Sequence, residues 1–120
     1  APAGGLPGGV IAAIICACLV PAIALLTAIA IPNFIKARDA SQRNICISNM
    51  RMIHVAKESA ALAHAYQDGQ TVQEEQVSAY LKKGFSGLAC PRGGRYTINP
   101  IGEEPECSTH GAMSAAAQRR

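Results

Sequence analysis

Residues 10–31 form an uncharged apolar run that constrains everything else this chain can fold into. The run contains one hydroxyl side chain, Thr27, and is followed by Pro32 and the basic residue Lys36. At about 1.5 Å per residue, a helix of this length reaches about 33 Å, which is enough to cross a hydrocarbon core of about 30 Å. The sequence therefore predicts a membrane-spanning helix.

Two other interpretations of the apolar run stay open. A cleaved secretory signal has a shorter apolar region, of about 7 to 15 residues, with basic residues ahead of it. No basic residue precedes this run, and it is longer. A lipoprotein anchor at Cys18 fits less well, since the run continues to Ile31. A membrane span is the better account of both observations.

The helical pattern continues past the run. Apolar residues recur at helical spacing with polar residues opposite, which predicts one helix over residues 11–66. Pro21 and Pro32 each remove a backbone hydrogen bond, so we expect kinks there. We divide this part of the chain into a Pro/Gly linker (1–9), a transmembrane half (10–31) and an amphipathic half (32–66). The expected apolar stripe consists of Ile45, Cys46, Met52, Ile53, Ala56 and Ala60.

The sequence after the long helix predicts a small head over residues 67–113. Thr71 and Glu74 have the spacing of a capping box, and Gly84 suits a helix exit, so a second helix is expected between them. A short strand around Tyr96 and a return strand at Cys107 would form a β-hairpin. Residues 114–120 resemble a frayed tail. The predicted fold class is therefore α+β.

Composition and residue spacing narrow the classes of function that this chain can have. The net charge of +3 is too mild for a dedicated nucleic-acid binder. His54 and Glu58 lie four residues apart on the predicted helix, while His64 lies on another face. These positions do not bring a nucleophile, a base and an orienting group together. We therefore expect that the protein is not an enzyme and binds no cofactor.

Residues 28–44, AIAIPNFIKARDASQRN, resemble the end of the hydrophobic segment of type IV pilins and of type II secretion or competence pseudopilins. The CPRGG-Y-I arrangement that runs on to Cys107 is similar to the C-terminal region of small pilin-like proteins. The resemblance implies a lollipop fold, with one long bent helix and a globular head on its exposed half. It also implies a structural subunit that assembles into a filament through its apolar helix.

The resemblance further implies partners, a location and a set of helix residues. The partners are the same or related pilin subunits, inner-membrane lipid and the assembly machinery. The location is the bacterial inner membrane, with the head on the periplasmic or exterior side, or an extracellular filament. The basic residues that follow the span would instead favour a cytoplasmic head. Filament contacts are expected at Ile14, Leu19, Ile23, Leu26, Ile29 and Phe34.

Two positions depart from the family pattern. The processing glycine of the family would fall on Val10, and its acidic residue on Ile15. In the family that carboxylate is thought to pair with the N-terminal amine of a neighbouring subunit. The alternative function is therefore a pilin-like interaction module that is anchored in the membrane and does not polymerise.

Three of the five cysteines lie outside the apolar run. Cys90 and Cys107 bracket the predicted hairpin, and a disulfide between them would stabilise an exported head by about 3 kcal/mol. Pairing of Cys46 with either one is an alternative. A zinc site would add His110 to these cysteines, but the sequence lacks paired C-x-x-C motifs, so we expect no metal.

Arg92 and Arg95 could contact an anion such as a nucleic-acid phosphate. A DNA-contacting minor pseudopilin is therefore a further alternative. An ordinary solvated surface is the favoured account of these two side chains.

Overall fold

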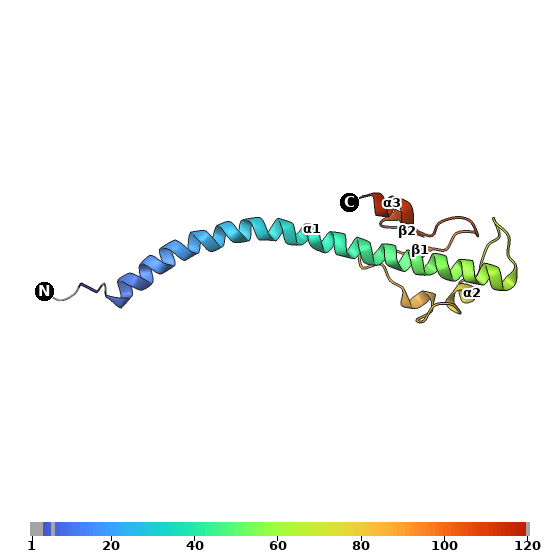
Figure 1. Ribbon diagram of the computed structural model, residues 1–120, viewed down its shortest axis with the longest axis horizontal. Coiled ribbons are helices and arrows are strands. Elements are labelled where there is room, and N and C mark those ends of the chain that lie inside the picture. The colour runs from blue at the N-terminus through green and yellow to red at the C-terminus, as the bar shows by residue number, and fades with distance from the viewer. Residues whose placement is uncertain (1–3, 6, 120) are drawn as a thin grey trace. The chain divides into compact units, whose positions relative to one another are not determined.

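The computed structural model describes residues 4–5 and 7–119 (Figure 1). It divides into two compact units, of which the first ends at Ala37 and the second begins at Arg38. Helix α1, Gly8–His64, contributes residues to both. The chain thus has one long apolar N-terminal helix and a small head with helices and strands, which confirms the predicted α+β class. Residues 1–3 and 6 of the predicted linker lie outside the described residues, and α1 already includes the last two linker positions.

The first unit is a helix whose side chains have no cover within the chain. All residues from 7 to 37 are exposed. Pro21 and Pro32 lie inside α1 and do not end it, and the kinks expected at them stay predictions. Thr27 donates its hydroxyl to the carbonyl oxygens of Ile23 and Ala24, at 2.8 and 2.9 Å. The lone hydroxyl of the apolar run is therefore satisfied within the helix itself.

Helix α1 ends at His64, two residues before the predicted end. The next residue, Ala65, has a left-handed backbone with φ of 56°. The backbone N–H of Tyr66 then donates to the carbonyl of Ala61 at 2.9 Å. This is the Schellman hydrogen bond that closes many helices, and it usually has glycine at the left-handed position. Because an alanine carries no stop signal in the sequence, the helical pattern predicts a helix that continues to residue 66.

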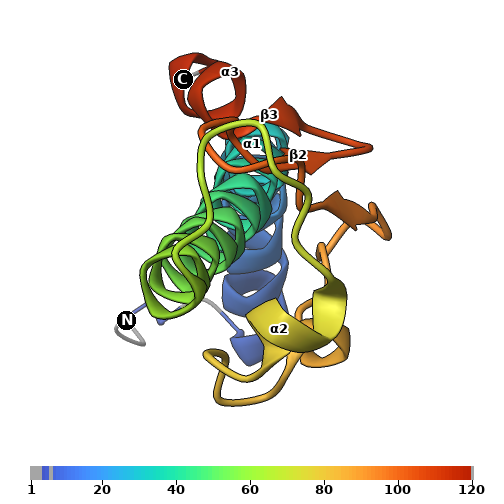
Figure 2. The ribbon, with the colours of Figure 1, turned by 90° about the vertical axis from the view of Figure 1, so that its right-hand side faces the viewer.

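The second unit adds a three-stranded antiparallel sheet in the order β1-β2-β3. Strand β1 (Tyr96–Thr97) pairs with β2 (Glu106–Cys107), and β2 pairs with β3 (Gly111–Ala112). Tyr96 lies opposite Cys107, so the predicted strand and its return strand are confirmed. The third strand was not predicted. Figures 1 and 2 show helix α2 and helix α3 on different sides of the α1 segment within this unit.

The second helix is shorter than predicted and begins later. Helix α2 covers Glu74–Ser78, and a 3-10 helix, η1, covers Phe85–Gly87. The capping box uses Gln73 and Gln76, so the predicted cap at Thr71 is wrong. Gln76 can fill this role because its side chain accepts from the Gln73 backbone N–H at 3.2 Å.

The core lies along one side of α1 and includes Cys46, Ile53, Ala56 and Ala60 of the predicted stripe, but not its other two members. Ile45 and Met52 are 47% and 44% exposed, so their placement in the stripe was wrong. The buried positions advance in alternating steps of four and three residues, which keeps them on one face of a helix. They are Cys46, Met50, Ile53, Lys57 and Ala60, flanked by Ile47, Ala56 and Ala61.

The prediction of a frayed tail at residues 114–120 was also wrong. Residues 113–118 form helix α3, Met113–Gln118, and Ala116 is only 1% exposed. Met113 and Ala117 pack against the same hydrophobic core. Alanine and methionine favour helix, and one small apolar face gives this short segment a surface to bind. The chain end is therefore part of the head up to Arg119.

Candidate functional site

Three cysteine sulfurs and one imidazole meet inside the head. Cys46 comes from α1, Cys90 from the segment after η1, and Cys107 from strand β2. His110 ends the tight turn between β2 and β3. Their ligand atoms all lie within 4.8 Å of one another. We call these four residues the sulfur–imidazole cluster.

The distances place His110 between two of the thiols. Its Nδ1 atom lies 3.5 Å from Cys90 Sγ and 3.8 Å from Cys107 Sγ. The three cysteines are 0 to 4% exposed, and His110 is half-buried at the edge of the cluster.

The cluster perturbs its own ionisation. Burial and the neighbouring thiols, opposed by Tyr96, raise the pKa of Cys46 to about 12. Burial also acts on Cys107, but backbone hydrogen bonds from Thr109 and His110 and contacts with the other two thiols lower its pKa. One sulfur thus holds negative charge more readily than its neighbour, as expected when thiols share one site.

Positive charges surround the imidazole. Burial lowers the pKa of His110, and the charges of Arg43, Arg92 and Arg119 lower it further. These effects favour the neutral imidazole, which is the form that binds metal ions. The cluster therefore combines a neutral nitrogen ligand with three sulfur ligands and a cationic rim.

The predicted disulfide between Cys90 and Cys107 is not formed in this structure. Both are buried free thiols, as is Cys46, while Cys16 and Cys18 are exposed free thiols of α1. The sequence placed Cys90 and Cys107 correctly as neighbours. It undervalued the Cys107-x-x-His110 spacing, a local signal that two ligands flank one turn.

The two predicted anion contacts differ. Arg92 forms an ion pair with Asp39 of α1, and its Nε donates to Gln42 Oε1 at 3.3 Å. Its charge is thus already matched by a carboxylate. Arg95 is exposed, and its backbone N–H donates to Ser108 Oγ at 2.9 Å. The two guanidinium groups therefore do not form a common anion-binding site in this structure.

Two side chains that the sequence analysis did not single out join α1 to the head. Lys57 is fully buried, and its Nζ donates to the carbonyls of Ile98 and Pro100, both at 3.1 Å, and of Glu103. Burial lowers the pKa of Lys57. The available signal was its position one turn after Ile53, on the stripe that faces the core.

Asn49 is the second unpredicted contact. Its Nδ2 donates to the carbonyl of Ala89 at 3.1 Å and to the Tyr96 hydroxyl at 3.0 Å. Ala89 directly precedes Cys90, so this amide fixes the chain beside the sulfur–imidazole cluster. Burial raises the pKa of Tyr96, so the hydroxyl stays neutral.

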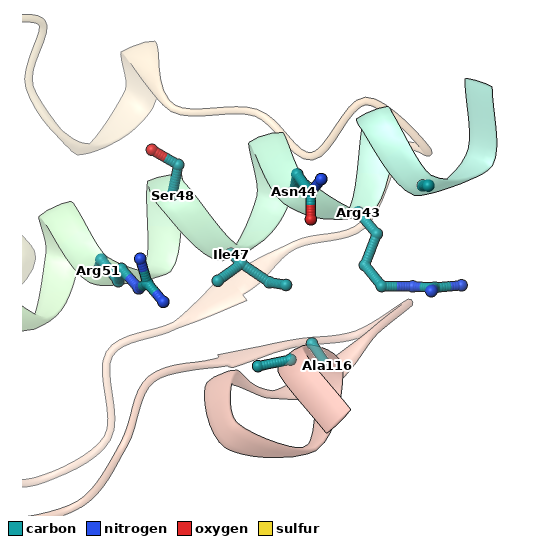
Figure 3. Close-up of a pocket in the computed structure, with 8 residues that line it drawn as sticks. Arg43, Asn44, Ile47, Ser48, Arg51 and Ala116 are labelled. Carbon is teal, nitrogen blue, oxygen red and sulfur yellow. The ribbon is translucent and has the colours of Figure 1, made fainter. Parts of the chain in front are cut away.

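A pocket of about 620 Å³ lies between α1 and α3 (Figure 3). Figure 3 shows Arg43 and Arg51 bordering it, with Ile47 between them and Ala116 on the facing helix. Arg43 already donates to the carbonyl of Arg119. The pocket thus marks where α3 leaves part of α1 uncovered, and its polar groups do not converge on one point.

The side chains predicted to make filament contacts are all exposed in the first unit. Their exposed fractions range from 49% to 69% for Ile14, Leu19, Ile23, Leu26, Ile29 and Phe34. Helix α1 is long and apolar enough to cross a membrane, by length and composition. A signal sequence near the N-terminus passes the same criterion.

Comparison with known proteins does not assign the chain to a family. No protein-family model matches it, and neither the curated proteins nor the solved structures contain a match.

Proposed function

We propose that this protein is a structural subunit of a type IV pilus-like or pseudopilus filament, anchored and assembled through the apolar part of α1. The observation that carries this proposal is that every residue from 7 to 37 is exposed. Leaving an apolar helix of this length in water is unfavourable, because removing apolar surface from water stabilises a protein by about 25 cal/mol for each Å². Its cover must come from lipid or from other helices.

The composition of the first unit suits both kinds of cover. The one hydroxyl of residues 10–31, that of Thr27, bonds within the helix, so this run presents no unsatisfied hydroxyl to lipid. Alanines between the larger residues allow neighbouring helices to approach closely. We infer a pilin-like lollipop, in which the head covers the second part of α1 and subunits or lipid cover the first.

The resemblance of residues 28–44 to pilins and pseudopilins supports the filament over other membrane assemblies. The head is expected on the periplasmic or exterior side of the inner membrane. Related subunits and the assembly machinery are the expected partners. DNA contact is the less favoured proposal because Arg92 is paired with Asp39.

A second candidate is a membrane-anchored module that does not polymerise. Ile15 stands where pilins carry a carboxylate, and its side chain is exposed and apolar. Without that carboxylate, the apolar bundle lacks the charge pair that helps to align neighbouring pilin subunits. The anchor would then need only lipid.

The native cysteines of the first unit distinguish the two candidates. Cys16 and Cys18 lie two residues apart and so point about 200° apart around the helix. Mild oxidation in membranes should link a filament subunit on two sides and produce a ladder of oligomers. The Cys16→Ser and Cys18→Ser single variants should stop at dimers, and the double variant should remain monomeric. Filaments should be visible by electron microscopy.

The non-polymerising module predicts a different result. The wild-type chain would stay monomeric after oxidation, and detergent would extract one small species. A ladder that persists in the double variant would come from the head cysteines and would contradict the proposed contact through α1.

A further inference from the structure

We propose that Cys46, Cys90, Cys107 and His110 bind one tetrahedral transition-metal ion, with zinc as the expected metal. Three thiolates and one imidazole form a ligand set of structural zinc sites. Sulfur-rich tetrahedral sites favour zinc over harder ions such as magnesium and calcium. This proposal is independent of filament assembly.

The spacing of the four ligand atoms fits a single ion. Zinc lies about 2.3 Å from sulfur and about 2.0 Å from nitrogen, so a tetrahedron has sulfur–nitrogen edges of about 3.6 Å. Cys90 Sγ and Cys107 Sγ lie 3.5 and 3.8 Å from His110 Nδ1. All four ligand atoms lie within 4.8 Å of one another, a limit that accommodates a sulfur–sulfur edge of about 3.8 Å.

The backbone is shaped around these sulfurs. A Cβ atom added at Gly94 would lie 2.7 Å from Cys107 Sγ, so glycine lets the chain after Cys90 pass close to that sulfur. Gly111 has a φ of 81° and closes the turn that presents His110. Asn49 fixes the carbonyl beside Cys90 from the α1 side. The ligands therefore come from three segments that other contacts already hold.

The charge around the cluster matches the metal complex. Three thiolates and a neutral imidazole on a dication give one net negative charge. Arg43 and Arg119 lie near enough to act on His110 and would stabilise that charge, whereas Arg92 is already paired with Asp39. Binding would break three S–H bonds, form three sulfur–metal bonds and release three protons to the solvent. No oxidant or reductant is needed.

A disulfide explains the cluster less completely. A bond between Cys90 and Cys107 would leave the buried thiol of Cys46 and the imidazole beside it without a role. A metal uses all four groups. It also connects α1, the segment at Cys90 and the β2–β3 turn, which would stabilise a head with few large apolar side chains.

The test uses the whole 120-residue chain in detergent. We expect the protein isolated from cells to contain one zinc per chain by elemental analysis. In denaturant without reductant, all five cysteines should react with a thiol reagent after chelation. Added Co²⁺ should replace zinc and give the absorption bands of tetrahedral cobalt with thiolate ligands. The Cys16→Ser/Cys18→Ser double variant is the matched control and should bind zinc fully.

Ligand variants separate metal binding from folding. Cys107→Ser should lower the zinc content at least tenfold, and a second variant is needed because unfolding would give the same loss. His110→Cys replaces nitrogen by sulfur, so it should retain one metal per chain and change the Co²⁺ spectrum. Isolation of the chain with a Cys90–Cys107 disulfide would overturn the proposal. A reduced, folded chain that gives no thiolate–cobalt bands would overturn it as well.

Discussion

The two parts of helix α1 differ in where their polar side chains form hydrogen bonds and in what covers their apolar side chains. In residues 8–37, the side-chain hydrogen bonds of Thr27 return to the helix backbone, and the apolar side chains are exposed. In residues 38–64, polar side chains leave the helix and bind the head, as Asn49 and Lys57 do. One continuous helix thus has a part that the chain covers and a part that its surroundings must cover.

The difference shows how a small head stays attached. The buried face of α1 includes Ala56, Ala60 and Ala61, which contribute little apolar area each. Alanines instead let the head backbone approach the helix. Carbonyl oxygens brought this close need donors, because a buried unsatisfied carbonyl costs about 1–3 kcal/mol. The polar contacts of Asn49 and Lys57 therefore add to the apolar packing of the helix in joining this head to α1.

The strongest test of the covered part is Lys57→Met. The change leaves the carbonyls of Ile98, Pro100 and Glu103 without their donor, so we expect a loss of about 4 kcal/mol in the free energy of unfolding. Denaturation followed by circular dichroism would measure it. Lys82→Met changes an exposed lysine and should stay within about 0.5 kcal/mol. Equal effects of the two substitutions would show that the buried ammonium is not a major contact.

Lys57 also predicts a pH dependence. Burial lowers its pKa in the folded state, so the unfolded state binds more protons between that lowered pKa and the ordinary lysine pKa of about 10.4. The free energy of unfolding contributed by this group should therefore rise with pH in that window. Comparison with Lys57→Met isolates the contribution, because other titrations are common to both proteins. A slope that is the same in both would contradict it.

A charged substitution tests whether lipid covers the exposed apolar part of α1. Ile23→Lys places an ammonium near the middle of the apolar run, which costs about 3 kcal/mol in membrane insertion, or about 100-fold in partitioning. Met52→Lys is the control, because Met52 is an exposed apolar residue of the covered part. Vesicle flotation should show release of the first variant and retention of the second. Release of both would mean that the two parts of α1 do not differ in environment.

Sequence patterns predicted the elements better than their contacts. The apolar run, the α+β class and the pairing of Tyr96 with Cys107 followed from local composition and alternation. The core face of α1 was wrong at Ile45 and Met52 because hydrophobicity alone assigned it. Lys57 lies on the buried face of α1. A sequence-based prediction would assign a charged residue to that face only if its carbonyl partners were known. Those partners belong to a loop distant in the sequence.

The sulfur–imidazole cluster shows the same limit. Only the Cys107-x-x-His110 step is local, while Cys46 and Cys90 reach the site through the fold. A ligand search that requires paired C-x-x-C motifs therefore undervalues it. The short α3 was missed for a related reason. Its helix depends on burial of Ala116 against the head, which composition does not reveal.

A smaller effect is expected from Asn49→Ala. The variant loses the hydrogen bonds to Ala89 and to the buried Tyr96 hydroxyl, which should cost about 1.5 kcal/mol. Asn44→Ala, at an exposed position five residues earlier on α1, should change stability by less than about 0.5 kcal/mol. Chemical denaturation measures both. If the two variants matched, the covered part of α1 would owe its attachment to apolar burial alone.

The smallest effect concerns the end of the covered part. Ala65 closes α1 in a left-handed conformation at φ 56°, where a Cβ atom is unfavourable and glycine is not. Ala65→Gly should therefore raise the free energy of unfolding by about 0.5–1 kcal/mol, since strain relief exceeds the added entropy of the unfolded chain. Ala63→Gly, inside the last helical turn, should lower it by a similar amount. Opposite signs at two exposed alanines would show that backbone conformation, rather than side-chain contact, ends the helix; a loss of stability in both would show that the Schellman bond of Tyr66 holds without strain.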